Sequence, residues 1–483
     1  MMMSKLSGLI SAWCVLTLAV SSVPAFAQGS QGQPMQGGAG QGGAGQVPAG
    51  TAGGQQRAWF GNGTGRIGQN LSGRLSLGGG AIDRRRTDPV TFDETIRRSD
   101  NWHASGGLTY ALTGASASLA ISAGSSVNSF AGLSDQLVVS HRGQVSAGLP
   151  LSSRTSLSAS VGAFREPTVV RYLRGLFGSG PGFAPPDDFD AGDVRDATVS
   201  YQASASLRQE LTTRSALAFG YNHRRSNYAG ADEQQIHDNA SARYTLSITE
   251  GFGVRFGYGY MTSRQDVPGA VRSENHHVDA GVNYNKALSL SRNTTLSFGT
   301  GSAIARSQNH TRFFVTGDAG LTHRIGRSWS VAGHYSRNVR FIEGVTEVAF
   351  VDSMSANVGG NPAARVTLNA SVSTHRGGVG LGAGQNPLRG LAGHAAVSIA
   401  AAQNVGLSLH YGYYRSRFGS TAFLLSPELQ LFERHTVGVS VGLWGLVSLG
   451  VNYSDATHPF NHNRAVLASV GFFAPLYARA RQF

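Results

Sequence analysis

The chain has 483 residues, of which 14% are charged and 41% are hydrophobic, with 65 glycines and a formal net charge of +13. These values exclude neither a soluble protein nor a membrane β-barrel, because a barrel averages an apolar exterior with a polar interior. The order of the residues argues against a helical membrane protein, since no apolar run of about 18 residues follows the N-terminal segment.

The first 27 residues have the features of a secretory signal peptide. Lys5 precedes an apolar run over residues 9 to 20, and Ala25 and Ala27 occupy the small-residue positions before an expected cleavage site at Gln28. The single cysteine lies in this segment, so we expect no disulfide and no thiol chemistry in the exported protein. Its 38 arginines and two lysines do not require a nucleic-acid partner.

The next region, residues 28 to 70, is expected to be a disordered periplasmic tail. Residues 28 to 56 read "QGSQGQPMQGGAGQGGAGQVPAGTAGGQQ", a Gly/Gln-rich sequence with too few apolar side chains to order itself. A single domain is expected to follow over residues 71 to 483. The tail is too short and too rich in glycine to form a folded plug, which argues against a TonB-dependent receptor.

The remainder of the chain alternates apolar and small polar residues in segments that predict β-strands. In "RYTLSITEGFGVRFGYGYM" (243 to 261), Leu246 and Ile248 alternate with Ser247, and after the break at "TEG" Phe256 lies between Arg255 and Gly257. Such period-two patterning puts one set of side chains on each face, and the short break makes the pair a hairpin.

The connections between these segments are short and long in turn. The tight breaks lie at 113 to 115, 150 to 154, 212 to 214, 249 to 251, 289 to 293, 326 to 328, 361 to 365, 402 to 404 and 443 to 445. The longer connections lie around 83 to 100, 124 to 135, 165 to 196, 227 to 237, 265 to 274, 307 to 311, 342 to 351, 376 to 390, 417 to 432 and 457 to 463. Nine tight turns and ten longer connections predict an all-β chain of about 20 strands, within a range of 18 to 22.

The chain resembles the porin-like outer-membrane β-barrels of Gram-negative bacteria. The resemblance rests on the signal peptide, the alternating strands, the two classes of connection and a terminal phenylalanine, Phe483. It implies a transmembrane antiparallel up-and-down barrel in the bacterial outer membrane, with short periplasmic turns and long extracellular loops. It also implies outer-membrane lipid and the barrel-assembly machinery as partners, and it leaves a homotrimer and a monomer open. Pro475 interrupts the last segment, so the residues that complete the closing strand stay open.

If the apolar positions face lipid, the opposite positions line the lumen. The lumen and selectivity residues expected from this pattern are Arg74, Arg142, Arg208, Arg224, Arg243, Arg255 and Arg340. Arginines in a water-filled pore favour anions, because the low-dielectric surroundings focus their field and the guanidinium binds carboxylate or phosphate. The alternative is that these arginines support the loop bases and pair with loop acids.

The third long connection, residues 165 to 196, is a candidate constriction loop. It is the longest connection, and it combines an apolar section with an acidic one. The acidic residues expected at the constriction are Asp187, Asp188, Asp190 and Asp193. In the porins that this chain resembles, the third loop folds inward and its acids face an arginine wall. An exposed cap over the outer mouth is the alternative.

The sequence carries no motif that favours an enzyme, a metal site or a cofactor. Protease, esterase and phosphate-loop patterns are absent, and His276 and His277 are adjacent in a predicted strand, so they point to opposite faces. The hypothesis is therefore a channel for small hydrophilic solutes, with anions favoured by the arginines. Two alternatives remain: an outlet for an extracellular polymer such as a polysaccharide, and a structural barrel with a filled lumen.

Overall fold

The computed structural model describes the chain from residue 67 to residue 481, apart from several connections. The signal peptide, the expected tail and the acidic residues of the third long connection lie outside the described residues. The undescribed positions between the ends are 88 to 90, 92, 115 to 116, 132 to 135, 168 to 196, 229 to 232, 250, 267 to 271, 288 to 292, 308 to 309, 342 to 347, 382 to 385, 419 to 430 and 458 to 460.

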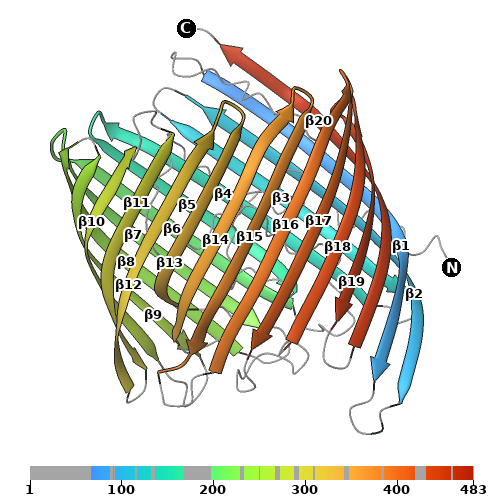
Figure 1. Ribbon diagram of the computed structural model, residues 1–483, viewed down its shortest axis with the longest axis horizontal. Helices are drawn as coiled ribbons and strands as arrows, with labels where there is room; N and C mark the ends of the chain where they lie inside the picture. Colours follow the sequence, from blue (N-terminus) through green and yellow to red (C-terminus); the bar gives the residue numbers. More distant parts are fainter. Residues whose placement is uncertain are drawn as a thin grey trace.

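The described residues form one closed sheet of 20 antiparallel strands (Figure 1). Each strand pairs with the next along the chain, and β1 pairs with β20 to close the barrel. The strands are β1 (Ile67–Thr87), β2 (Glu94–Thr113), β3 (Ser118–Ala131), β4 (Gln136–Ser152), β5 (Thr155–Pro167), β6 (Ala197–Glu210), β7 (Ser215–Tyr228), β8 (Glu233–Thr249), β9 (Phe252–Gln265), β10 (Ser273–Ala287), β11 (Thr294–Ser307), β12 (His310–Ile325), β13 (Trp329–Phe341), β14 (Val348–Ala363), β15 (Val366–Val379), β16 (Asn386–Ala402), β17 (Val405–Phe418), β18 (Leu431–Leu443), β19 (Val447–Thr457) and β20 (Asn461–Arg481).

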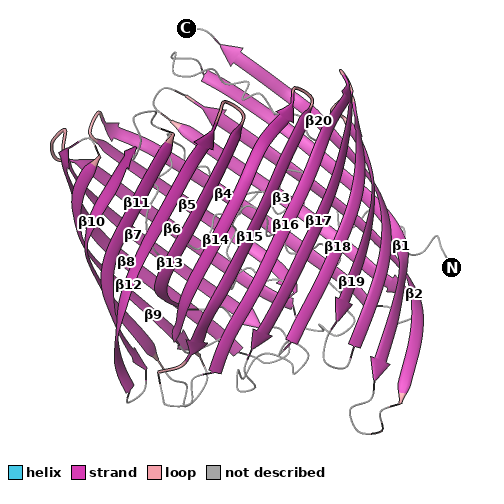
Figure 2. Ribbon diagram, in the orientation of Figure 1, coloured by secondary structure: helices cyan, strands magenta, loops and turns pink. Residues whose placement is uncertain are grey.

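The expected up-and-down barrel and its strand count are confirmed. The nine expected tight turns join each even-numbered strand to the next one, and the described tight turns lie along the upper rim in Figure 2. The strands run further than the sequence pattern predicts: β1 begins at Ile67 rather than at residue 71, and β1 and β2 extend to Thr87 and from Glu94. β5 likewise continues to Pro167, so the third long connection is shorter than expected. These extensions lie beyond the apolar band and are polar, so the sequence pattern does not distinguish them from loops.

The two faces of the strands differ in chemistry as the alternation predicts. Residues that are paired across neighbouring strands share a face, and one face carries Val161, Phe256 and Phe313, which are 62%, 56% and 61% exposed. A closed barrel cannot bury this face in a core, so it is the lipid face of an outer-membrane barrel. No helix in the described part of the chain is long and apolar enough to cross a membrane.

Aromatic residues border the apolar band. Tyr258, Tyr411 and Tyr453 lie on the lipid face toward the long connections, which mark the extracellular end, and each is between 39% and 50% exposed. Trp444 lies in the turn between β18 and β19 at the opposite end and is 65% exposed. Tyr and Trp prefer the interface between hydrocarbon and water. The two aromatic levels therefore mark the two membrane surfaces.

The closing strand accommodates Pro475 through a bulge. In the pairing of β20 with β1, Ser72 faces Pro475 and Leu71 faces Tyr477, so Leu476 has no partner residue. A bulge leaves one residue unpaired and reverses the alternation beyond it, and proline is tolerated at bulges because it lacks the backbone donor. Even-numbered residues before Leu476 and odd-numbered residues after it therefore share one face of the sheet. The closing strand thus runs through Pro475 as far as Arg481.

The lipid face predicts how charge is tolerated. Ala159 is exposed on the lipid face midway along β5, whereas Ser158 faces the lumen and bonds to Ser206. Changing Ala159 to Arg should destabilise the barrel by about 2 to 4 kcal/mol, because the charge would lie in hydrocarbon. Ser158→Arg is the control and should fold normally. Urea titration of folding in lipid vesicles measures both, and equal losses would contradict the two faces.

The two ends of the barrel predict which positions are accessible from outside the cell. Asp93 is exposed in the connection from β1 to β2, and Arg327 is exposed in the tight turn from β12 to β13. An impermeant thiol reagent should label Asp93→Cys on intact cells and should not label Arg327→Cys until the outer membrane is broken. The opposite labelling would show that the barrel is inserted the other way.

Candidate functional site

The seven arginines expected in the lumen all lie on the face opposite the lipid face. They come from seven strands, in the order Arg74 (β1), Arg142 (β4), Arg208 (β6), Arg224 (β7), Arg243 (β8), Arg255 (β9) and Arg340 (β13). The register fixes this placement, because Arg74 is directly opposite Gly107 while its neighbour Leu75 is opposite Phe472 on the lipid face.

The described carboxylates on the inner face of the strands are those of Glu166, Glu210 and Asp318. Each forms an ion pair with an arginine: Arg142 Nη2 to Glu166 Oε1 at 3.4 Å, Arg208 Nη2 to Glu210 Oε1 at 3.7 Å, and Arg255 Nη2 to Asp318 Oδ1 at 3.1 Å. The inner face carries further arginines, so the described wall is polar with an excess of positive charge.

Arg255 shows how the wall holds one of these charges. Its side chain leaves β9 and reaches Asp318 on β12, and it is only 6% exposed. A methyl group on Gly299 would overlap the Arg255 guanidinium, and one on Gly281 would lie 3.3 Å from its Nε. These two glycines, on the strands between β9 and β12, leave the groove in which the side chain lies. Arg255 is therefore part of the wall and does not project freely into the lumen as the sequence led us to expect.

The remaining arginines differ in exposure. Arg74 and Arg208 are exposed toward the lumen, whereas the others are partly buried: Arg142, Arg224, Arg243 and Arg340. The exposed pair lies toward the tight-turn end, where Arg324 and His334 also face the lumen and are exposed. Water therefore reaches the inner face in the periplasmic half of the barrel.

Many side chains on the extracellular half of the inner face are buried, although Arg97 and Arg312 are exposed. Side chains near the strand ends that meet the long connections have exposures between 0% and 6%: Thr198, Ser200, Ser226, Gln235, Ser273, Asn275, Ala305, Val351, Leu388 and Asn463. The lumen is thus open to solvent toward the periplasm and packed toward the cell exterior.

The β13–β14 hairpin contributes to this packing, because its upper part leaves the wall. β12 pairs with β13 only from Gly317, opposite Arg337, to Ile325, opposite Trp329. Above that point β13 stays paired with β14 as far as Phe341, opposite Val348. In the described strands, residues 310 to 316 of β12 therefore have a neighbour on the β11 side alone.

Contacts above this seam place the hairpin inside the barrel. Phe350 of β14 stacks on Phe314 from the inner face of β12, with ring centroids 4.6 Å apart. Phe341 of β13 lies 5.7 Å from the ring of His237 on the inner face of β8. Val348 packs in one buried cluster with Ala303 and Ala305 of β11. Met354, Phe350 and Val348 lie on the same face of β14. This face meets lipid at Met354, and toward the extracellular end it covers the inner wall of β8 to β12.

The sequence explains why the hairpin fits there, although its signal was missed. Residues 348 to 351 read "VAFV", so both faces of β14 are apolar at this point and neither suits a watery lumen. Opposite them, the inner face of β11 carries Ala303 and Ala305, which are 1% and 0% exposed and leave room for Phe350. This apolar run, with no polar residue between its side chains, was the feature of the sequence that pointed to the inward fold.

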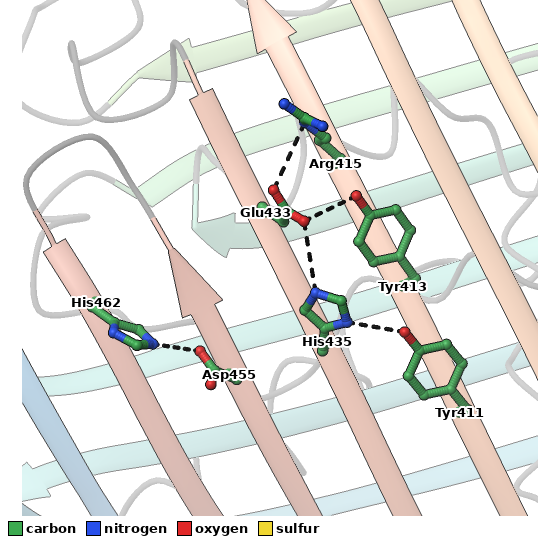
Figure 3. Close-up of polar contacts among 7 residues, drawn as sticks. All are labelled: Tyr411, Tyr413, Arg415, Glu433, His435, Asp455 and His462. Carbon is green, nitrogen blue, oxygen red and sulfur yellow. Dashed lines mark hydrogen bonds and ion pairs between the residues drawn. The ribbon is translucent and has the colours of Figure 1, made fainter.

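The lipid face carries two polar clusters of the same form at the aromatic border, and Figure 3 shows the one on β17 and β18. On β17 and β18, Tyr411 bonds to His435 at 2.9 Å and Tyr413 donates to Glu433 at 3.0 Å. On β9 and β10, Tyr258 and Tyr260 contact His276 and Glu274 in the same way, at 2.7 and 3.2 Å. The described residues contain no group of three or more His, Cys, Asp or Glu arranged to hold a metal ion. The clusters thus lie at the outer membrane surface as hydrogen-bonded pairs.

No protein-family model matches the chain, and no curated protein matches it. Among solved structures, the chain is similar to the siderophore receptor PirA from Pseudomonas aeruginosa, with 9% identity and a TM-score of 0.45, over 84% of this chain and 80% of that one. It is also similar to the FrpB iron transporter from Neisseria meningitidis, with 10% identity and a TM-score of 0.46, over 84% and 81%. Likeness at this level carries no argument about function, which rests on the residues of the barrel itself.

The inward position of the hairpin can be tested by cross-linking. Cysteines at His237 and Phe341 should be joined by a short bifunctional methanethiosulfonate reagent, because the two native rings are 5.7 Å apart in the lumen. The cross-link changes the electrophoretic mobility of the denatured chain, and reductant should reverse the change. Cysteines at His237 and Met354 are the control and should not cross-link, since Met354 lies on the lipid face. Cross-linking in the control alone would contradict the inward fold.

Proposed function

We propose that this protein is an outer-membrane channel for small hydrophilic solutes and that its lumen favours anions. The observation that carries the proposal is the charge of the inner face: its described carboxylates, on Glu166, Glu210 and Asp318, are each paired to an arginine, and arginines remain in excess. In a narrow aqueous path within a low-dielectric wall, such an excess raises the local concentration of anions.

The path has two parts in this proposal. The periplasmic half is a polar vestibule where Arg74 and Arg208 meet solvent. The extracellular half is narrowed by the β13–β14 hairpin, whose stack of Phe350 on Phe314 holds it against the wall. The hairpin would set the size of the solute, and the arginines would set its charge. The role that the sequence suggested for Asp187, Asp188, Asp190 and Asp193 falls outside the described residues.

A filled structural barrel is the second candidate, and one observation favours it. Inner-face side chains near the extracellular ends, such as Thr198, Gln235 and Leu388, are 0% exposed in the described structure. A lumen packed in this way conducts only if some of the packing moves.

Charge reversal in the vestibule tests the channel. Changing Arg74 and Arg208 to Glu alters the local charge by four units, so the reversal potential in a salt gradient should move toward cations. The shift should be largest at low salt, where the screening length is longest. Planar-bilayer recording measures it. Arg154→Glu with Arg327→Glu, which reverses two exposed charges in tight turns, is the control and should shift the potential less.

The outcomes separate the two candidates. Anion preference in the parent protein and its loss in the Arg74 and Arg208 variant support the channel. An equal shift in the turn control would assign selectivity to the mouth of the barrel, against the proposal. A folded parent protein that carries no current at any voltage would favour the filled barrel.

A further inference from the structure

Three arginines stand side by side on the lipid face of β15, β16 and β17. Arg376 of β15 is directly opposite Arg389 of β16, and Arg389 is directly opposite Arg417 of β17. All three are exposed, and all three share the face that carries the exposed side chains of Val372 and Leu391. They therefore form a continuous row of positive charge across three neighbouring strands.

Such a row is unfavourable unless something compensates it. Side chains directly opposite each other have Cβ atoms about 5 Å apart, and like charges at this distance destabilise the sheet. Elsewhere on the outer face the strands avoid this arrangement. Arg464 lies opposite Asp455 on the neighbouring strand, and Arg98 lies opposite Asp83. No other run of three arginines in register occurs on the outer face of the described strands.

The acids nearest the row are already occupied. Asp352 lies opposite Arg376, but Arg337 donates to both of its oxygens, at 2.7 and 3.0 Å, and Tyr335 donates to one of them at 2.8 Å. In the described structure the three arginines form no ion pair with a carboxylate.

The acid on the other side is held in the cluster drawn in Figure 3. Glu433 accepts from Tyr413, and Arg415 and His435 lie within 3.7 and 3.6 Å of it. The two flanking clusters thus engage the nearest described acids. Asp352 offsets part of the charge of Arg376, and the described residues leave the row with an excess of positive charge.

The row lies at the level where lipid headgroups begin. On β15 and β16, Val372 and Leu391 lie on the periplasmic side of the arginines, and both are exposed to lipid. On β17, Tyr411 and Tyr413 of the aromatic border precede Arg417 along the strand toward the cell exterior. A ligand for the row must therefore be anionic and must reach it from the outer leaflet.

We propose that this row binds the phosphate groups of a phosphorylated lipid in the outer leaflet. The guanidinium is planar, stays charged and donates in pairs to phosphate oxygens, which suits it to this ligand better than a lysine. Three arginines on adjacent strands span about 10 Å, given a strand spacing of about 4.8 Å. A headgroup with one or two phosphates fits that span, while its acyl chains lie along Val372 and Leu391. The proposal is independent of any transport through the lumen.

Lipid binding to the purified full-length barrel in detergent tests the site. The probes are diphosphoryl lipid A and the same lipid after removal of both phosphates, and native mass spectrometry counts the bound molecules. Replacing Arg376, Arg389 and Arg417 with Gln should weaken binding of the phosphorylated probe by about tenfold or more, because several charged hydrogen bonds are lost. The dephosphorylated probe should bind the parent and the variant equally.

A matched control removes the same charge elsewhere on the outer face. Arg98, Arg225 and Arg306 are exposed and lie on other strands, and their replacement with Gln should change binding by no more than about twofold. Heat-modifiable electrophoretic mobility verifies folding. If the triple variant does not fold, Arg389→Gln alone carries the test, since it removes the central member of the row and should still weaken binding.

Three outcomes would overturn the proposal. An undiminished affinity of the folded variant would show that the row does not hold the phosphates. An equal loss in the control would assign binding to overall charge. Displacement of the bound lipid by millimolar inorganic phosphate would assign the row to a soluble anion instead.

Discussion

The closure of the hydrogen-bonded sheet is the constraint on which the rest of this structure depends. Hydrocarbon offers no partner for a backbone N–H or C=O group, so the described strands are paired on both sides, except at residues 310 to 316 of β12 above the seam. Pairing of β1 with β20 supplies the last of these bonds. This pairing includes Pro475, which β20 tolerates because a bulge at Leu476 lies next to it. Once the sheet is closed, each side chain faces either lipid or the lumen, and all of the functional chemistry follows from that division.

The same division gives arginine two opposite environments in one chain. On the inner face Arg255 lies flat over two glycines and is neutralised by Asp318 three strands away. On the outer face Arg376 and Arg389 stand next to each other, and the acid opposite Arg376, Asp352, is bonded to Arg337. Local sequence around these residues is equally rich in small and polar positions. Their different surroundings come from the strands beside them, which decide whether a carboxylate lies within reach.

Much of the fold could be predicted from the sequence, because it depends on period-two alternation and on short polar turns, which are local signals. The hairpin over residues 243 to 261 and the face of Arg74 follow from that pattern alone. The inward fold of the β13–β14 hairpin could not be predicted this way, since it depends on contacts such as Phe341 with His237, residues that are far apart in the chain. The row from Arg376 to Arg417 was equally hidden, because register between strands depends on the lengths of the connections as well as on the strands themselves.

The seam between β12 and β13 has a consequence for the mechanics of the barrel. Below Gly317 the strands form an unbroken hoop of backbone bonds, and its circumference is fixed by the number of strands and their stagger. Above Gly317 the hoop is interrupted, so the extracellular rim is a band with a free end at residues 310 to 316 of β12. The seam thus divides the barrel into a continuous hoop toward the periplasm and an interrupted sheet toward the cell exterior.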